Sequence, residues 1–141
     1  MAAAITGLIE EIVQAYHRLT RASDQLHAKL GLTTGMRSVL LTLENGPPLT
    51  ISAIAVQRSV SRQFMQRLVQ DMVGGGWLSL EINPEDRRVS LVAPTAKARR
   101  AIVKLRKVET PLFSELQSHF SQADLTRATD VLKRINVLLS A

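Results

Sequence analysis

The feature of this sequence that most constrains its fold is the order of short patterned segments between residues 49 and 95. Leu49-Thr50 opens a short apolar stretch, and Ser59 and Ser61 separate it from a second stretch with helical spacing. Three glycines at 74–76 end that stretch, and two short runs with period-two alternation follow. Threonine and serine are good helix N-caps, and alternating runs are typical of half-buried strands. The segment therefore predicts a helix, a tight break, a second helix and a β-hairpin.

The helix predicted over residues 62–73 has two chemically different faces. We expect a buried stripe at helical spacing, made of Phe64, Met65, Leu68, Val69, Met72 and Val73. The opposite face carries arginine and glutamine instead of the usual Glu/Lys mixture: Arg62, Gln63, Gln66, Arg67 and Gln70. Arginine can bond guanine, and glutamine adenine, through two hydrogen bonds in the major groove. This face is a candidate for reading DNA, and the alternative is an ordinary solvated helix face.

The two alternating runs predict a hairpin with one buried face and a basic tip. We expect its core-facing residues to be Leu78, Leu80 and Ile82 on the first strand and Val89, Leu91 and Ala93 on the second. The loop between the strands places Arg87 and Arg88 next to Glu85 and Asp86. A short helix, a tight break, an Arg/Gln-faced helix and a basic hairpin together predict a winged helix-turn-helix.

Long amphipathic helices are expected on both sides of this segment. Apolar residues recur at steps of three and four over residues 4–30, and a second helix is expected from Thr33, burying Met36, Val39, Leu40 and Leu43. Another helix should begin at Thr95 and be kinked or ended by Pro111. A last helix, capped by Ser121, should bury Leu125, Leu132, Ile135 and Leu139.

The predicted fold is mainly α with a small β-hairpin wing, arranged as one domain over residues 1–141. Its winged helix-turn-helix spans about residues 33–95, and the flanking helices span about 4–30 and 96–140.

The positive charge of the chain is concentrated in one block. Residues 58–107 contain eleven Lys or Arg and four Asp or Glu, a net charge of +7, while the rest of the chain has a net charge of −1. A localised basic patch indicates a polyanionic partner, although basic residues can also serve only solubility.

Several other classes of protein do not fit the sequence. There is no cysteine for a disulfide or a thiolate metal site. The amino-terminal residues lack the basic start of a signal peptide, and no apolar run approaches the length of a membrane span. The sequence has no H-E-x-x-H motif, glycine-rich phosphate loop or nucleophile elbow. We therefore expect a soluble, cytoplasmic protein that is not an enzyme, has no cofactor and does not bind a membrane.

The ordered set of motifs resembles the MarR family (multiple antibiotic resistance regulators) of winged-helix transcription factors. The residues that carry the resemblance are Leu49-Thr50, Ala55, Val60-Ser61-Arg62, Gly76-Trp77 and Asp86-Arg87-Arg88. The chain departs from the family pattern at the helix-turn-helix break, where Ser59 replaces the usual glycine. We expect Ser59 to adopt a conformation that suits glycine better.

The resemblance implies a homodimeric DNA-binding regulator in which the flanking helices interlock between subunits. Its recognition helix would enter the major groove, with Gln63, Gln66 and Arg67 at base edges and Ser61 and Arg62 near phosphates or bases. In the wing, Arg88 would enter a flanking minor groove, Arg87 would contact phosphate and Asp86 would brace Arg88. Two copies would then bind a pseudo-palindromic operator on double-stranded DNA.

The resemblance also implies a repressor that a small phenolic or carboxylate ligand releases from DNA. The candidate effector site lies between the first, second and fifth helices and would be bordered by Tyr16, His17, Met36 and Arg37. Tyr16 and Met36 have an alternative reading as core residues.

Two alternative functions for the same fold remain open at this point. A metal-responsive regulator could use the pairs Asp24–His27 and Glu115–His119, each on one helical face, although no metal site is predicted. A winged helix can also serve protein contacts, against which the Arg/Gln face and the localised charge argue.

Overall fold

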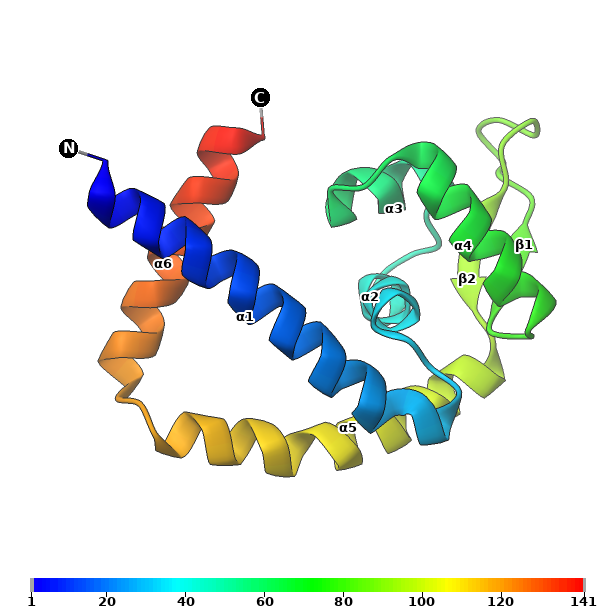
Figure 1. Ribbon diagram of the computed structural model, residues 1–141. Coiled ribbons are helices and arrows are strands. Elements are labelled where there is room, and N and C mark those ends of the chain that lie inside the picture. The colour runs from blue at the N-terminus through cyan, green and yellow to red at the C-terminus, as the bar shows by residue number, and fades with distance from the viewer. Residues whose placement is uncertain (1, 141) are drawn as a thin grey trace. The chain divides into compact units, whose positions relative to one another are not determined.

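The fold is built from helices joined by short caps and one small hairpin, in a computed structural model that describes residues 2–140 (Figure 1). Its elements are α1 (Ala3–His27), a 3₁₀ turn η1 (Ala28–Leu30), α2 (Thr34–Leu43), α3 (Ile51–Arg58), α4 (Arg62–Gly74), β1 (Leu78–Glu81), β2 (Leu91–Pro94), α5 (Ala96–Ser118) and α6 (Gln122–Leu139). This confirms the predicted class, mainly α with a β-hairpin wing. Contacts divide the chain into two units, one up to Leu105 and one from Arg106 onward, and each is described by itself.

Five helices, α2 to α6, start at the caps that the sequence predicts. The side-chain oxygens of four residues, Thr33, Thr50, Ser61 and Ser121, each accept a hydrogen bond from the backbone N–H three residues later. Thr95 does the same for Ala98 at the start of α5. Each such cap contributes about 1 kcal/mol by satisfying a donor that the helix cannot pair.

The break between α3 and α4 is made by a serine in the left-handed region. Ser59 has φ 56° and ψ 41°, and within residues 2–140 no other non-glycine residue has a positive φ. Its N–H donates to the carbonyls of Ala55 and Val56, which closes α3. The expectation of an uncomfortable conformation at Ser59 is confirmed.

We expect Ser59→Gly to raise the free energy of unfolding by about 0.5–1 kcal/mol. The left-handed conformation costs a residue with a Cβ about 1–2 kcal/mol. Glycine avoids this cost, but it loses more conformational entropy on folding, which offsets part of the gain. Urea unfolding at fixed protein concentration measures it. Ser61→Ala, two residues away, should lower stability by about 1 kcal/mol through loss of the α4 cap. Equal or lower stability of Ser59→Gly would contradict the strain at this turn.

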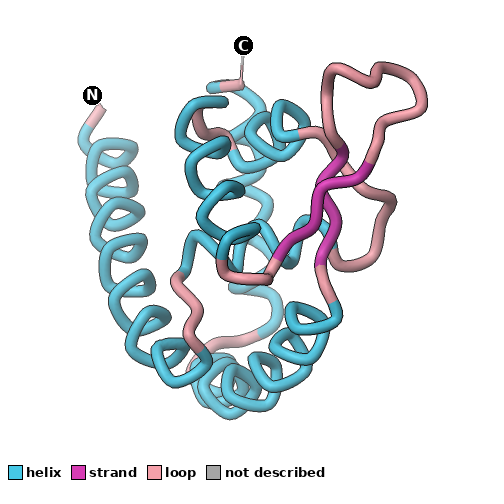
Figure 2. The backbone as a smooth tube through the Cα atoms, turned by 90° about the vertical axis from the view of Figure 1, so that its right-hand side faces the viewer, coloured by secondary structure: helices cyan, strands magenta, loops and turns pink. Residues whose placement is uncertain are grey.

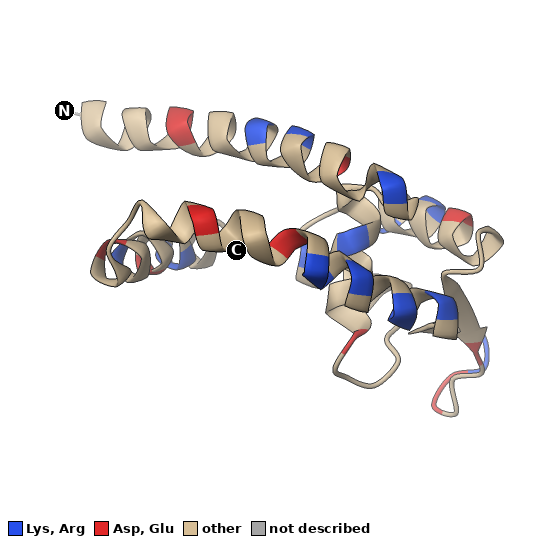
Figure 3. Cartoon of the chain, turned by 90° about the horizontal axis from the view of Figure 1, so that it is seen from below, with Lys and Arg blue, Asp and Glu red and all other residues tan. Residues whose placement is uncertain are grey.

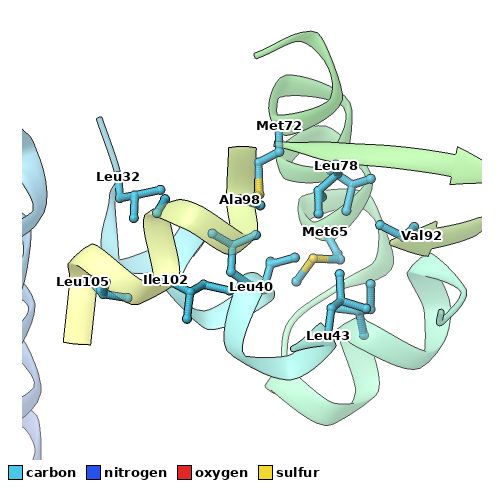
Figure 4. Close-up of a cluster of buried hydrophobic side chains, with 14 of the residues drawn as sticks. Leu32, Leu40, Leu43, Met65, Met72, Leu78, Val92, Ala98, Ile102 and Leu105 are labelled. Atoms are coloured by element: carbon cyan, nitrogen blue, oxygen red, sulfur yellow. The ribbon is translucent and has the colours of Figure 1, made fainter. Parts of the chain in front are cut away.

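One hydrophobic core lies within the unit up to Leu105. Side chains from α2, α4, the hairpin and the first half of α5 meet there, as Figure 4 shows. The apolar residues with no more than 3% exposure are Leu32, Val39, Leu40, Leu43, Ile54, Ala55, Met65, Val69, Met72, Leu78, Val92, Ala98, Ile102 and Leu105. The stripe expected on α2 faces this core, with Met36 partly buried at its edge, and Ala98, Ala101, Ile102 and Leu105 of α5 also pack there.

The predicted stripe on α4 is wrong at one position. Met65, Val69 and Met72 are buried, and Leu68 and Val73 pack against the core. Phe64 is instead 50% exposed. It lies in the first turn of α4, beside the break at Ser59, so it extends past the edge of the core.

The hairpin is buried only at its base. The register pairs Leu78 with Pro94 and Leu80 with Val92. Leu78 is 2% exposed, whereas Leu80 is 52% exposed and Ile82 is also exposed, which corrects the prediction of one continuous buried face. The wing loop extends beyond the two short strands (Figure 2). Leu80, near the loop end of β1, and Ile82, just past it, are not part of the core.

The second strand also faces the core differently from the prediction. Val92 is fully buried, whereas Val89 and Leu91 are only partly buried; Ala93 is buried as expected. Val92 exchanges two backbone hydrogen bonds with Leu49, at 2.7 and 3.2 Å. The strand is therefore covered on one edge by the segment before α3, which the alternation pattern does not reveal.

The flanking helices differ from prediction mainly in their burial. Of the two outcomes expected at Pro111, a kink or a helix end, the end does not occur, because Pro111 lies inside α5. The residues expected to be buried on α6 are not buried in the single chain, and Leu139 is 79% exposed. α1 likewise exposes Ile5, Ile9, Val13, Tyr16 and Leu19. Throughout the described part of the chain, every helix is too short or too polar to cross a membrane.

Candidate nucleic-acid interface

The exposed face of α4 is a continuous polar surface. Burial of Met65, Val69 and Met72 turns the opposite side of the helix outward. Four residues of that side line one shallow hollow: Gln63, Gln66, Arg67 and Gln70. All four side chains can donate hydrogen bonds and none is acidic, so the face suits hydrogen-bond acceptors on a polyanion.

Hydrogen bonds fix the start of α4 and the end of α3. Arg62 Nε donates to Ser52 Oγ of α3 at 3.0 Å, and Ser61 Oγ accepts from the backbone N–H of Phe64 at 3.1 Å. Arg58, at the end of α3, donates to Ser38 Oγ of α2 at 3.3 Å. Ser38 and Ser52 were not singled out from sequence, because nothing local connects them to arginines twenty and ten residues away.

The wing loop holds one arginine in a fixed frame. Asp86 Oδ1 accepts from both the backbone N–H and the Nε of Arg88, each at 3.1 Å, and its Oδ2 accepts from Nη2 at 3.3 Å. Asn83 Oδ1 accepts from the N–H of Glu85, which shapes the preceding turn. The Arg88 side chain is 90% exposed, so the ion pair orients the guanidinium without burying it.

The ionisation of Asp86 matches this arrangement. The side-chain hydrogen bond from Arg88 lowers the pKa of Asp86, and the backbone N–H of Arg88 lowers it further. Asp86 is therefore charged at neutral pH, and its bonds to Arg88 weaken only in acid, below the usual aspartate range.

Part of the polar α4 face and Arg88 share one cavity, here called the α4–wing cleft. It has a volume of about 320 Å³. Its polar lining comes from α3, α4 and the hairpin: Ser52, Arg62, Gln66, Gln70, Arg88 and Ser90. Two arginines and no carboxylate line it, which favours a negatively charged partner. Gln63, Arg67 and Arg87 lie outside this cleft, and Gln70 is a member that the predicted contact set omitted.

The residues suggested for an effector lie elsewhere. Tyr16 is exposed on α1, with its ring edge-on to His17 at a centroid distance of 5.6 Å, so it is not a core residue of the single chain. Met36 packs against the core from α2. Neither the α4–wing cleft nor the α4 hollow includes these residues or Arg37, and their role as an effector site stays a prediction.

Asp24, one of the suggested metal ligands, has a structural role. Its Oδ1 accepts from the N–H and the hydroxyl of Thr34, at 2.8 and 2.7 Å, which connects α1 to the start of α2. These bonds from Thr34 lower the pKa of Asp24. No group of three His, Asp or Glu side chains positioned to hold a metal ion occurs within residues 2–140.

A short helix, a left-handed turn, a polar-faced helix and a hairpin with a braced arginine define a winged helix-turn-helix. Over residues 30–89 the sequence matches the family model of the MarR family.

Two relatives match most of this chain. An uncharacterised protein of Mycobacterium tuberculosis is 28% identical over 137 residues, which cover 97% of this chain and 95% of that protein. A protein of Thauera aromatica, named as a transcriptional regulatory protein for the hcr operon, is 25% identical over 105 residues, which cover 74% of this chain and 63% of that protein.

Solved structures show the same fold. A mutant of Escherichia coli MarR in complex with operator DNA superposes with a TM-score of 0.85 at 20% identity, covering 96% of this chain and 97% of the other. The transcriptional repressor CouR bound to a 23-mer DNA duplex has a TM-score of 0.82 at 20% identity, covering 96% of both chains.

Proposed function

We propose that this protein is a homodimeric, sequence-specific DNA-binding transcription regulator. The observation that carries this proposal is the α4–wing cleft, where Gln66 of α4 and the braced Arg88 of the wing line one surface. A recognition helix needs hydrogen-bonding side chains that reach base edges, and a wing that enters the minor groove needs an exposed cation. Two proteins of the same fold, MarR and CouR, have been crystallised on DNA, which supports this use of the fold.

In this proposal α4 lies in the major groove. Gln63, Gln66 and Arg67 would reach base edges, while Ser61 and Arg62 would meet the backbone near the helix N-terminus, where free N–H groups favour phosphate. Arg88 would enter the adjacent minor groove, which attracts arginine most strongly where A·T-rich DNA narrows it. Arg87 would contact phosphate.

The proposed dimer rests on apolar side chains that the single chain does not cover. α1 exposes Ile5, Ile9 and Val13, and α6 exposes Leu132 and Leu139. Exposed apolar side chains that recur along one helix are typical of a protein–protein interaction surface. A second copy of the chain is the proposed occupant, so the two recognition helices would lie about one DNA turn, roughly 34–36 Å, apart on an imperfect palindrome.

The finer proposal is a repressor released by a small phenolic or carboxylate ligand near Tyr16, His17, Met36 and Arg37. A ligand of this kind would act through a coupling free energy of about 1–3 kcal/mol between its own site and DNA. The arginine supplies a charge for a carboxylate, and the exposed Tyr16 ring supplies apolar area.

The DNA proposal is tested by selecting bound duplexes from a random pool and measuring their affinity at several salt concentrations. We expect enrichment of an inverted repeat and a log–log salt slope of about −0.9 per phosphate contacted. Addition of salicylate-like compounds to the protein–DNA complex tests whether a ligand of this kind releases the protein from DNA. An interaction with duplex DNA that shows no sequence preference would refute a specific regulator, and a salt-insensitive interaction only with protein would favour a protein-contact module.

A further inference from the structure

More than half of the cations in the central basic block lie outside α4 and the wing. Six of its eleven cations are on α5, the helix that follows the wing. Three of them, Lys97, Arg100 and Lys104, recur at steps of three and four residues and therefore share one helical face. Figure 3 shows several Lys and Arg segments in a row along this helix.

These three cations line a cavity together with Lys29 of η1. The cavity has a volume of about 250 Å³, and its apolar wall is formed by Leu30, Trp77 and Ala101. We call it the Trp77 pocket. All of its lining residues belong to the unit up to Leu105, none is acidic, and none is shared with the α4–wing cleft.

The wall of the Trp77 pocket is held by close packing. A Cβ added at Gly75 would lie 2.9 Å from the Trp77 ring, and one added at Gly31 would lie 3.7 Å from it, so the ring packs over two glycines. The hydroxyl of Thr95 donates to the Gly76 carbonyl at 2.6 Å and lies 3.2 Å from the Trp77 carbonyl. The aromatic wall is therefore preorganised.

One cation of the pocket is fixed and three are available. Lys97 Nζ lies 4.2 Å from the centroid of the Trp77 ring and donates to the Gly75 carbonyl at 2.7 Å. Within residues 2–140, no carboxylate pairs with Lys29, Arg100 or Lys104. Like charges gathered in a cavity without acids repel each other, and an anion of matching charge relieves that repulsion.

We propose that the Trp77 pocket binds a small, multiply charged anion of the phosphate-ester or polyphosphate class. Four cations call for several negative charges, and the Arg100 guanidinium matches the geometry of a phosphate through paired N–H donors. The volume lies below the usual range of about 300–1,000 Å³ for pockets of drug-sized ligands, so the ligand is small. The site is concave and shares no residue with the α4–wing cleft, which favours a small ligand over the DNA backbone.

The experiment uses inorganic pyrophosphate as the probe and the single tryptophan of the chain as the reporter. Titration at constant ionic strength, balanced with potassium chloride, should give a saturable change in the fluorescence of Trp77. Arg100→Gln should weaken binding by about tenfold, the equivalent of one lost charge-assisted hydrogen bond. The matched control is Arg99→Gln, the adjacent residue of α5, which does not line the pocket and should stay within about twofold of the wild type.

The outcomes separate this proposal from DNA binding. Absence of saturation up to roughly 10 mM pyrophosphate, or equal weakening by Arg99→Gln and Arg100→Gln, would overturn it. Citrate binding as tightly as pyrophosphate would overturn the phosphate class, and displacement of pyrophosphate by short duplex DNA would reassign the pocket to the DNA backbone. Pyrophosphate binding that persists in Arg88→Ala supports the pocket even if the DNA proposal fails.

Discussion

Replacement of Arg88 by alanine is expected to lower the affinity for the selected operator by about 5- to 150-fold, because a positioned arginine in a groove contributes roughly 1–3 kcal/mol. The loss should be largest on operators with A·T-rich flanks, where the minor groove is narrow and electronegative. The side chain is 90% exposed, so the free energy of unfolding should stay within about 0.5 kcal/mol of the wild type. Fluorescence anisotropy with labelled duplexes measures the affinity, and urea unfolding measures the stability.

Arg87→Ala is the matched control for this prediction, since it removes the same charge from the neighbouring residue. It should weaken binding less and uniformly across sequences, as expected for a phosphate contact. Asp86→Asn should fall between the wild type and Arg88→Ala, because it weakens the bonds that orient Arg88 while leaving the cation in place. Equal losses for the two arginines would refute the assignment of Arg88 to the minor groove.

Two leucines of the same strand are expected to differ strongly in their contribution to stability. Leu78→Ala should lower the free energy of unfolding by about 2–5 kcal/mol, because the side chain is 2% exposed in the core and its loss leaves a cavity. Leu80→Ala should cost less than about 1 kcal/mol, because that side chain is 52% exposed and loses little buried area. The sequence pattern alone treats the two positions as equivalent.

Urea unfolding followed by circular dichroism tests this pair. All variants should be compared at one protein concentration, because dimerisation would add a concentration-dependent contribution. The m-value should remain that of the wild type, so that a shift in midpoint reports stability. Equal losses for Leu78→Ala and Leu80→Ala would mean that the core extends along the whole hairpin, contrary to the structure.

The element order and the helix starts could be predicted because they depend on neighbouring residues. Thr50 and Ser61 cap helices by bonding an N–H three residues away, and this geometry needs no tertiary partner. Ser59 lies in the left-handed region because α3 must end before α4 begins within a few residues. The hydrogen-bonding character of the α4 face and the positive charge of the wing could also be predicted. Both are properties of the side chains themselves and do not depend on which elements pack behind them.

Burial could be predicted only where an element lies fully against the core. Leu78 and Leu80 share one period-two pattern, yet only Leu78 reaches the core. Phe64 shares the helical spacing of Met65 and Val69 and still lies outside. Periodicity identifies the face of an element, but it carries no information on where the neighbouring elements stop.

The composition of each site was decided by tertiary structure. Sequence alone determined that Arg88 lies two residues from Asp86 in a turn and that Gln66 lies on the polar face of a helix, because both follow from spacing along one segment. That these residues share a cleft with Ser52, and that Lys29, Trp77 and Arg100 surround a separate cavity, depends on how the helices pack. Residues separated by tens of positions meet only when burial of the core fixes the helices that carry them. Local sequence patterns contain no information on the distance between such residues in the folded chain.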